Sequence, residues 1–145
     1  MKPYPNSLEK NLRIRTETKS GSIFSKVRAA VGIYRVDEQC KIEYQGTVEL
    51  DTPRVPVGIP SERLSYMVFG FASSSFLANT SSTIRQETLL KPRAGYSYDI
   101  EVNYKDDIYN VVIRENHPPS GASRKIGLKG LSACRALDNT IGFVP

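Results

Sequence analysis

The sequence has little of what a catalytic site requires. Its 145 residues include one histidine, His117, which precedes two prolines in a polar stretch and is therefore expected in a surface loop. The adjacent pair Asp106–Asp107 is typical of a turn, and the serines at 73–75 lack the Gly-x-Ser-x-Gly pattern of a nucleophile elbow. The sequence therefore predicts no catalytic residues, and an enzyme with a cryptic carboxylate or serine site ranks last among the functions considered.

Motifs for cofactors and metals are absent as well. The chain has neither a GxGxxG nor a GxxxxGK[ST] pattern, so a dedicated nucleotide site is not expected. Two cysteines and one histidine cannot supply the four ligands of a structural zinc site. No loop carries regularly spaced acidic residues, as a calcium site would. We expect neither a cofactor nor a metal.

Long hydrophobic runs are missing. No stretch approaches the roughly eighteen apolar residues that cross a bilayer, and the first residues lack the apolar middle of a signal peptide. The chain is then either cytoplasmic or a mature fragment in which Met1 replaces a removed targeting segment. We favour the fragment, in a periplasmic or outer-membrane-anchored protein, because the Pro/Asn/Ser-rich opening resembles a tether. Residues 1–10 are predicted to be a flexible tether and 11–145 a single β domain.

The two cysteines, Cys40 and Cys134, lie 94 positions apart. In an exported chain we expect them to form a disulfide bond, which would stabilise the fold by roughly 4 kcal/mol in the chain-entropy model. The alternative is two buried thiols in a reducing compartment.

What the sequence does have is apolar residues in period-two alternation, the pattern of β-strands. It predicts strands at 12–18, 27–36, 64–72 and 83–90, and a hairpin over Tyr96–Arg114 with one wet face. A second hairpin is predicted over residues 40–50, with its turn at Gln45–Gly46. The proline-rich stretch 53–60 should be a loop or an edge segment, because proline lacks a donor for the strand ladder.

The remaining segments read as connections. Residues 73–82 are expected to form an exposed loop, and the tail from His117 is expected to be irregular apart from one helical turn within 132–137. Short strands separated by Pro, Gly and Ser turns indicate an all-β domain, either an antiparallel Ig-like sandwich or a small β-barrel.

Two stretches, Gly58–Val68 and Leu90–Ile100, resemble strand entries of the PEGA-like β-sandwich domains found in bacterial envelope lipoproteins. The likeness spans about residues 27–114. It implies a sandwich fold and an envelope location, without an assigned activity.

The charge layout indicates one kind of partner. Residues 1–35 contain eight Lys and Arg against two Glu, and residues 114–145 contain five against two acids, while the middle is acidic. Because the two ends of a domain often lie close together, a basic patch is predicted from both termini: Arg13, Arg15, Lys26, Arg28, Arg124, Lys125 and Lys129. Such a patch would attract an anionic surface. A solvated strand face is the plainer interpretation.

These observations favour a non-enzymatic accessory domain of the bacterial cell envelope, with another envelope protein or an anionic envelope surface as its partner. The alternative is an OB-like nucleic-acid-binding module. Nucleic acid is disfavoured because the aromatic stripe Tyr96, Tyr98 and Tyr104 lies beside Asp99 and Glu101, whose charge repels phosphate.

Overall fold

Nine β-strands and one short 3-10 turn make up most of residues 2–19, 25–75, 80–105 and 108–134, the parts of the chain that this computed structural model describes. They are β1 (Leu12–Lys19), β2 (Ser25–Val36), β3 (Ile42–Glu49), β4 (Arg54–Val57), β5 (Ser65–Ser75), β6 (Thr80–Leu90), β7 (Ser97–Lys105), β8 (Ile108–His117), β9 (Ala122–Ile126) and η1 (Leu131–Ala133).

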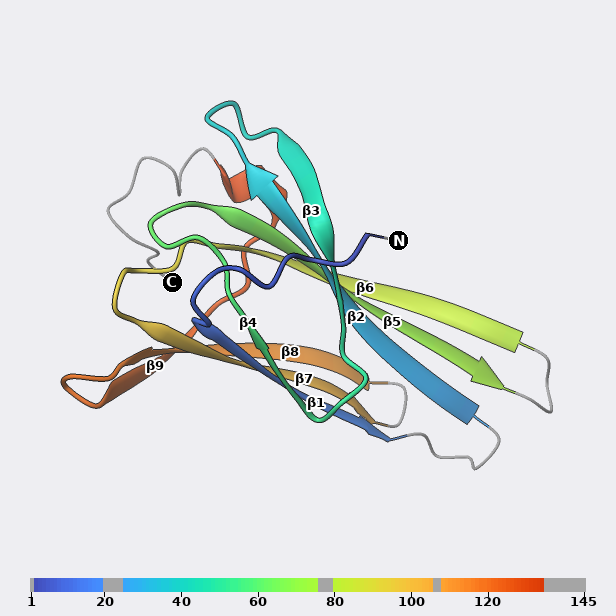
Figure 1. The fold of residues 1–145 in the computed structure, drawn as a ribbon. Coiled ribbons are helices and arrows are strands. Elements are labelled where there is room, and N and C mark those ends of the chain that lie inside the picture. Colours follow the sequence, from blue (N-terminus) through green and yellow to red (C-terminus); the bar gives the residue numbers. More distant parts are fainter. Residues whose placement is uncertain (1, 20–24, 76–79, 106–107, 135–145) are drawn as a thin grey trace.

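The strands form two sheets that pack face to face (Figure 1). The five-stranded sheet has the order β4-β1-β7-β8-β9, and the four-stranded sheet has the order β3-β2-β5-β6. Neighbouring strands run antiparallel except for β1 and β7, which pair in parallel from Leu12–Tyr98 to Lys19–Lys105. The predicted all-β sandwich is confirmed. The barrel alternative, and with it an OB-like architecture, is wrong because the sheets do not close on each other.

The core lies between the inward faces of the two sheets. Alternate residues of β1, β2, β5 and β7 point into it, as expected for half-buried strands. Each fully buried aliphatic or aromatic side chain there contributes about 1.5–3 kcal/mol relative to exposure. The largest of these buried side chains are Tyr98, Phe69, Phe71, Leu12, Ile14, Ile33, Ile59, Met67, Leu89, Leu90 and Ile100.

The hairpin predicted over Tyr96–Arg114 is confirmed as β7 and β8, whose register runs from Ser97–Asn116 to Lys105–Ile108. Its predicted turn at Asp106–Asp107 lies outside the described residues. The wet face of β7 is also confirmed, since Tyr98, Ile100 and Val102 are buried while Glu101 is exposed.

The hairpin predicted over residues 40–50 is wrong, because that stretch forms the single strand β3. Gly46 makes no turn: the register jumps from Ile33–Gly46 to Tyr34–Tyr44, so Gln45 is the extra residue of a bulge. The turn lies earlier, between β2 and β3. There the Asp37 carboxylate accepts hydrogen bonds from the backbone N–H groups of Gln39 (2.9 Å) and Lys41 (2.8 Å).

Two other predictions are corrected. The loop predicted over residues 73–82 is mostly strand, because β5 continues to Ser75 and β6 begins at Thr80. Serine and threonine runs do not exclude strands when a ladder supplies the hydrogen bonds. The tail also contains a strand, β9, which the sequence hides because only Ile126 in it is an apolar side chain buried in the core.

The first residues contact the sandwich at Tyr4. The backbone N–H of Tyr4 donates to Thr47 O of β3 (3.1 Å), and Tyr4 Oη donates to Gly58 O near the end of β4 (2.7 Å). Glycine is needed at Gly46 and Gly58, where a Cβ would stand 2.5 Å from Tyr4 Cα and from Glu9 O, respectively. The N-terminal segment, residues 2–11, thus links the edges of the two sheets.

The predicted disulfide bond between Cys40 and Cys134 is confirmed. It joins the turn after β2 to the residue that follows η1, and Cys134 is fully buried. The chain before η1 also pairs with β6, because Leu89 N donates to Lys129 O (2.7 Å). The C-terminal segment, residues 127–134, is therefore fixed on the four-stranded sheet both covalently and by hydrogen bonds. No helix in the described part of the chain is long and apolar enough to span a membrane.

Candidate anion-binding surface

The predicted basic patch is divided among four places in the structure. Arg13 and Arg15 of β1 share one sheet face with Lys125 of β9. Lys26 and Arg28 belong to β2 in the other sheet, and the side chain of Lys26 lies outside what the structure describes. The other two predicted residues point elsewhere: Arg124 binds a buried carboxylate, and Lys129 lies beside β6.

A different set of cations comes together on the outer face of the five-stranded sheet, the face turned away from the core. Successive strand residues alternate between the faces, so exposed Arg13 and Arg15 flank buried Ile14 and point outward. Arg54 of β4 and Arg114 of β8 are exposed in the same alternation. The register places Arg54 opposite Arg15 and Lys125 opposite Arg114.

Only one of these five cations has a carboxylate partner among the described residues. Arg13 Nε lies 2.8 Å from Asp99 Oδ1, and its terminal nitrogen lies 3.1 Å from Asp99 Oδ2. The other four form no ion pair with a described residue. We call this set the basic face: Arg15, Arg54, Arg114 and Lys125.

Acidic side chains on the same sheet face are fewer. Asp99 is occupied by Arg13 and by the amide of Asn116, which donates at 2.8 Å. Glu101 stands in register with Arg15 without forming an ion pair, and Glu17 has an interaction of its own. Five cations against three carboxylates leave this face positive where the side chains are described.

Like charges directly opposite each other on neighbouring strands destabilise a sheet. The basic face contains two such pairs, Arg15–Arg54 and Arg114–Lys125, on strands separated by β7. Each pair also has one carboxylate of β7 opposite it in the register, Glu101 opposite Arg15 and Asp99 opposite Arg114, but neither forms an ion pair with that cation. The arrangement gathers four exposed cations on one sheet face.

Arg54 and Arg114 were missing from the predicted patch for different reasons: Arg54 lies outside the two basic ends, and Arg114 was assigned to the hairpin. Arg54 lies within the acidic middle, among the prolines. The antiparallel pairing of β4 with β1 carries it to Arg15, a residue far away in the sequence. The alternation of apolar and polar residues around Arg114 could have placed it on this face, because it predicts an outward side chain on the hairpin's wet face.

Arg124 points inward to a buried carboxylate. Glu115 is only 3% exposed, and it receives Arg124 Nε at 3.0 Å and Tyr98 Oη at 2.7 Å. Arg93 Nε is 3.8 Å away, and the Arg93 backbone N–H donates to Tyr98 Oη at 3.0 Å. Burial, together with the neighbouring Glu115 carboxylate, raises the pKa of the Tyr98 hydroxyl above its ordinary value. This cluster links β7, β8 and β9, and it engages Arg124 in an ion pair although the side chain of Arg124 remains 41% exposed.

The one histidine was predicted in a surface loop, but it is the last residue of β8 and lies half-buried beside Tyr96, with ring centroids 4.6 Å apart. His117 Nδ1 is 2.7 Å from Ser120 Oγ, which also accepts the backbone N–H of Ala122 at 3.2 Å. These contacts belong to the tight β8–β9 turn and join residues three and two positions apart. No group of three or more metal-ligating side chains occurs in the described residues.

Comparison with known proteins adds no relative. No family model matches the chain, and no match was found among curated proteins or solved structures.

Proposed function

We propose that this chain is a non-enzymatic accessory domain of a bacterial cell envelope and that its basic face binds an anionic membrane surface. The observation that carries the proposal is the basic face itself: four exposed cations in two like-charged pairs, without an ion-pair partner in the described chain.

The disulfide bond supports the location. Disulfides persist in oxidising compartments and are rare in the cytosol of mesophiles. The Cys40–Cys134 bond therefore favours an exported chain. Within that class we propose the periplasm or an anchored position at the outer membrane, in keeping with the PEGA-like resemblance.

A lipid surface fits the basic face better than nucleic acid does. Single-stranded nucleic acid is usually bound by aromatic side chains that stack on bases beside the cations. The neutral side chains described on this face are Ser97, Asn103, Asn110, Val112, Asn116, Ser123 and Pro56, and none is aromatic. A sheet face can lie along headgroups without such contacts, and each Lys or Arg near an anionic membrane contributes about 1 kcal/mol.

The test is sedimentation with vesicles of phosphatidylcholine alone or mixed equally with phosphatidylglycerol. Neutralising one like-charged pair, as in Arg15→Gln/Arg54→Gln or Arg114→Gln/Lys125→Gln, should weaken binding to the anionic vesicles about 30-fold at low salt. The matched control is Arg28→Gln/Arg85→Gln, which removes the same charge from exposed positions of the four-stranded sheet and should bind like the parent.

Rising salt should release the parent protein, because screening shortens the reach of exposed charges. Equal loss in the control variant would show that net charge, not the basic face, determines binding. Binding to single-stranded DNA that exceeds binding to the vesicles and requires the same four residues would replace the membrane with nucleic acid.

A further inference from the structure

The strand β3 leaves part of one sheet edge uncovered. Edge strands present unpaired backbone N–H and C=O groups, and proteins usually protect them with proline, charge, short length or a covering segment. β4 contains Pro56, β9 has only five residues, and β6 receives Lys129 of the C-terminal segment at Leu89. Within the described chain, the edge of β3 is covered at Thr47 alone, where the N-terminal segment lies beside it (Figure 1).

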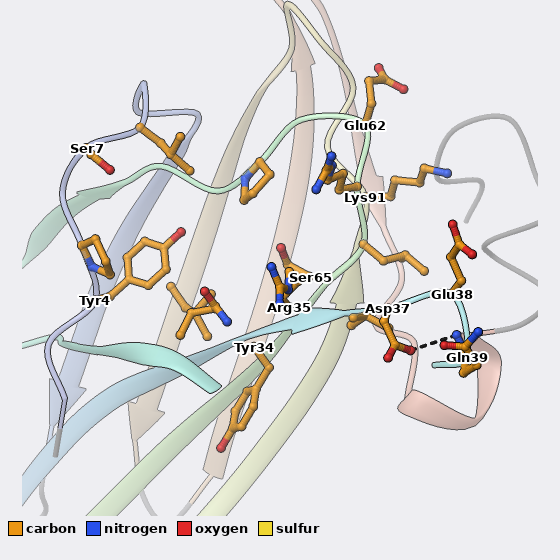
Figure 2. A pocket seen from close by; sticks show the side chains of 18 residues that line it. Tyr4, Ser7, Tyr34, Arg35, Asp37, Glu38, Gln39, Glu62, Ser65 and Lys91 are labelled. Atoms are coloured by element: carbon orange, nitrogen blue, oxygen red, sulfur yellow. Dashed lines mark hydrogen bonds between the residues drawn. The ribbon is translucent and has the colours of Figure 1, made fainter. Parts of the chain in front are cut away.

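The backbone groups of Ile42 and Tyr44 point away from β2, toward this open edge. Just before β3, the backbone N–H of Lys41 donates to the Asp37 carboxylate (2.8 Å), and its carbonyl accepts the N–H of Asp37 (2.9 Å). Figure 2 shows this turn from the adjoining cleft, with the Asp37 carboxylate bonded within its own loop. Because Lys41 faces the turn, the alternation of an antiparallel ladder directs the next residue, Ile42, outward, and Tyr44 likewise.

Exposed apolar side chains lie on the same stretch. Ile42 is 40% exposed and Tyr44 37%, so two of the four exposed large hydrophobic residues in the described chain stand two positions apart on this edge. Both belong to the outer face of the sheet, because Tyr44 packs against Tyr34 and strand residues two apart share a face. A further strand would cover these side chains and satisfy the open backbone groups, which makes the edge suited to strand addition.

The other face of this stretch carries complementary charges. Arg35 binds Glu43 Oε1 at 3.0 Å, and Gln45 Nε2 donates to the same oxygen at 3.2 Å. Lys41 is exposed and forms no ion pair with a described residue. If two copies of β3 pair antiparallel about Glu43, Lys41 of each copy lies diagonally across from Glu43 of the other, within reach of its long side chain. Arg35 and this lysine together offset the repulsion between the two glutamates.

We propose that β3 pairs antiparallel with β3 of a second copy of this chain. The two four-stranded sheets then join into one continuous sheet. Ile42 of each copy stands opposite Tyr44 of the other, and each such pair exchanges both of its backbone hydrogen bonds. A pairing this short buries less surface than a standard interface, so the dimer is weak and dissociates on dilution.

The symmetry of this dimer determines where the basic faces point. In an antiparallel pair of identical strands, the two-fold axis stands perpendicular to the sheet. The axis therefore keeps both five-stranded sheets on the same side of the joined sheet, and both basic faces point the same way. A dimer contacts one membrane with both faces, which increases its avidity. This consequence rests on the proposed membrane function, whereas the dimer itself does not.

The test is sedimentation equilibrium of the full chain at rising concentrations, combined with a charge exchange. The parent should shift from monomer to dimer as its concentration rises. Lys41→Glu gives the interface only acids at these two positions and Glu43→Lys gives it only bases, so each variant alone should dimerise about tenfold more weakly. An equimolar mixture of the two should recover the dimer, because each variant supplies the charge that the other lacks.

The matched control is Arg85→Glu, which makes the same charge change as Lys41→Glu at an exposed position of β6, on the opposite edge of the sheet. It should dimerise like the parent. Arg15→Gln/Arg54→Gln should do so as well, since the basic face takes no part in the pairing. Amide NMR signals that shift with concentration should centre on residues 41–45.

A parent that stays monomeric at millimolar concentration would overturn the proposal and leave the edge of β3 to a different protein. A dimer that neither charge variant weakens, or shifts centred on another strand, would overturn it as well. On anionic vesicles, Lys41→Glu should bind more weakly than Arg85→Glu, which has the same net charge. Equal vesicle binding by these two variants, despite a weakened dimer, would contradict the membrane consequence and leave the dimer standing.

Discussion

The outer faces of the two sheets differ in the types of residue that form them. On the four-stranded sheet, Tyr34 lies between Tyr44 and Tyr66, with ring centroids 5.3 and 5.7 Å apart. Tyr66 Oη donates to Glu87, and the C-terminal segment is attached beside it through β6 and the disulfide bond. On the five-stranded sheet, the outer face is polar and includes the four cations of the basic face. Figure 1 shows the two layers and the C-terminal chain beside β6.

The difference suggests a division of work between the two faces. Aromatic contacts, a cross-link and a covering segment are stabilising features, and they gather on one side of the sandwich. Like-charged pairs reduce stability, and they gather on the other side. We infer that the outer face of the four-stranded sheet stabilises the fold, while the outer face of the five-stranded sheet is free to bind a partner. The following predictions, in order of decreasing effect, test this contrast.

The largest effect is expected from removing the disulfide bond. Cys40→Ser/Cys134→Ser should lower the free energy of unfolding by roughly 4 kcal/mol in the chain-entropy model, measured by urea denaturation followed by circular dichroism. Binding of the folded variant to anionic vesicles should be unchanged. A variant that stays equally stable but no longer binds vesicles would reverse the assignment of roles.

The second-largest effect is expected on the inward side of the five-stranded sheet. Glu115→Ala should cost about 3 kcal/mol, because it leaves the buried Tyr98 hydroxyl and two arginines without their carboxylate. Glu115→Gln keeps an acceptor and should cost less. Thermal unfolding of both variants checks the order; equal losses would mean that the charge of Glu115, not its hydrogen bonding, is what matters.

A matched pair of glycine variants tests the N-terminal segment. Gly58→Ala should destabilise by about 2 kcal/mol, since its Cβ would overlap Glu9 O and Leu8 O. Gly70→Ala, in the middle of β5, would place its Cβ 4.0 Å from Ala30 O, an ordinary van der Waals contact, and should be neutral or stabilising by about 0.5 kcal/mol. Denaturation midpoints measure both. If both glycines tolerate alanine, the N-terminal segment does not contribute to the fold as described.

The smallest effect concerns Tyr66, whose pKa is raised to about 12 by burial and by its bond to Glu87. The folded state thus favours the protonated phenol, so this contribution is complete below pH 10 and is lost between pH 10 and about 12. Tyr66→Phe should cost about 1 kcal/mol at pH 7 and lose stability less steeply above pH 10. The free energy of unfolding of parent and variant, measured against pH, tests this prediction. Parallel curves would contradict the raised pKa of Tyr66.

Local patterns were enough to predict much of the fold. The alternation in β1, β7 and β8 identifies both the strands and their inward faces, since it depends only on neighbouring residues. The disulfide bond was predictable because only two cysteines are present. Gly46 misled the prediction, because glycine serves bulges and close contacts as well as turns.

What the sequence could not provide was pairing between distant segments. The parallel contact of β1 with β7 has no local signal, and it decides that Asp99 neutralises Arg13. The pairing of β4 with β1 places Arg54 beside Arg15 in the same way. The ion pair of Arg124 was not predictable, since nothing near it in sequence shows that Glu115 is buried. The candidate surface is therefore a product of sheet topology.

The most direct test of the central claim is the orientation of the domain on a membrane. Nanodiscs with phosphatidylglycerol and a gadolinium-chelating lipid broaden the amide NMR signals of residues that lie near the headgroups. We predict the strongest broadening at Arg15, Arg54, Arg114 and Lys125, with Gly32 and Gly70 of the four-stranded sheet unaffected. Stronger broadening of Gly32 and Gly70, or uniform broadening over both sheets, would contradict the account.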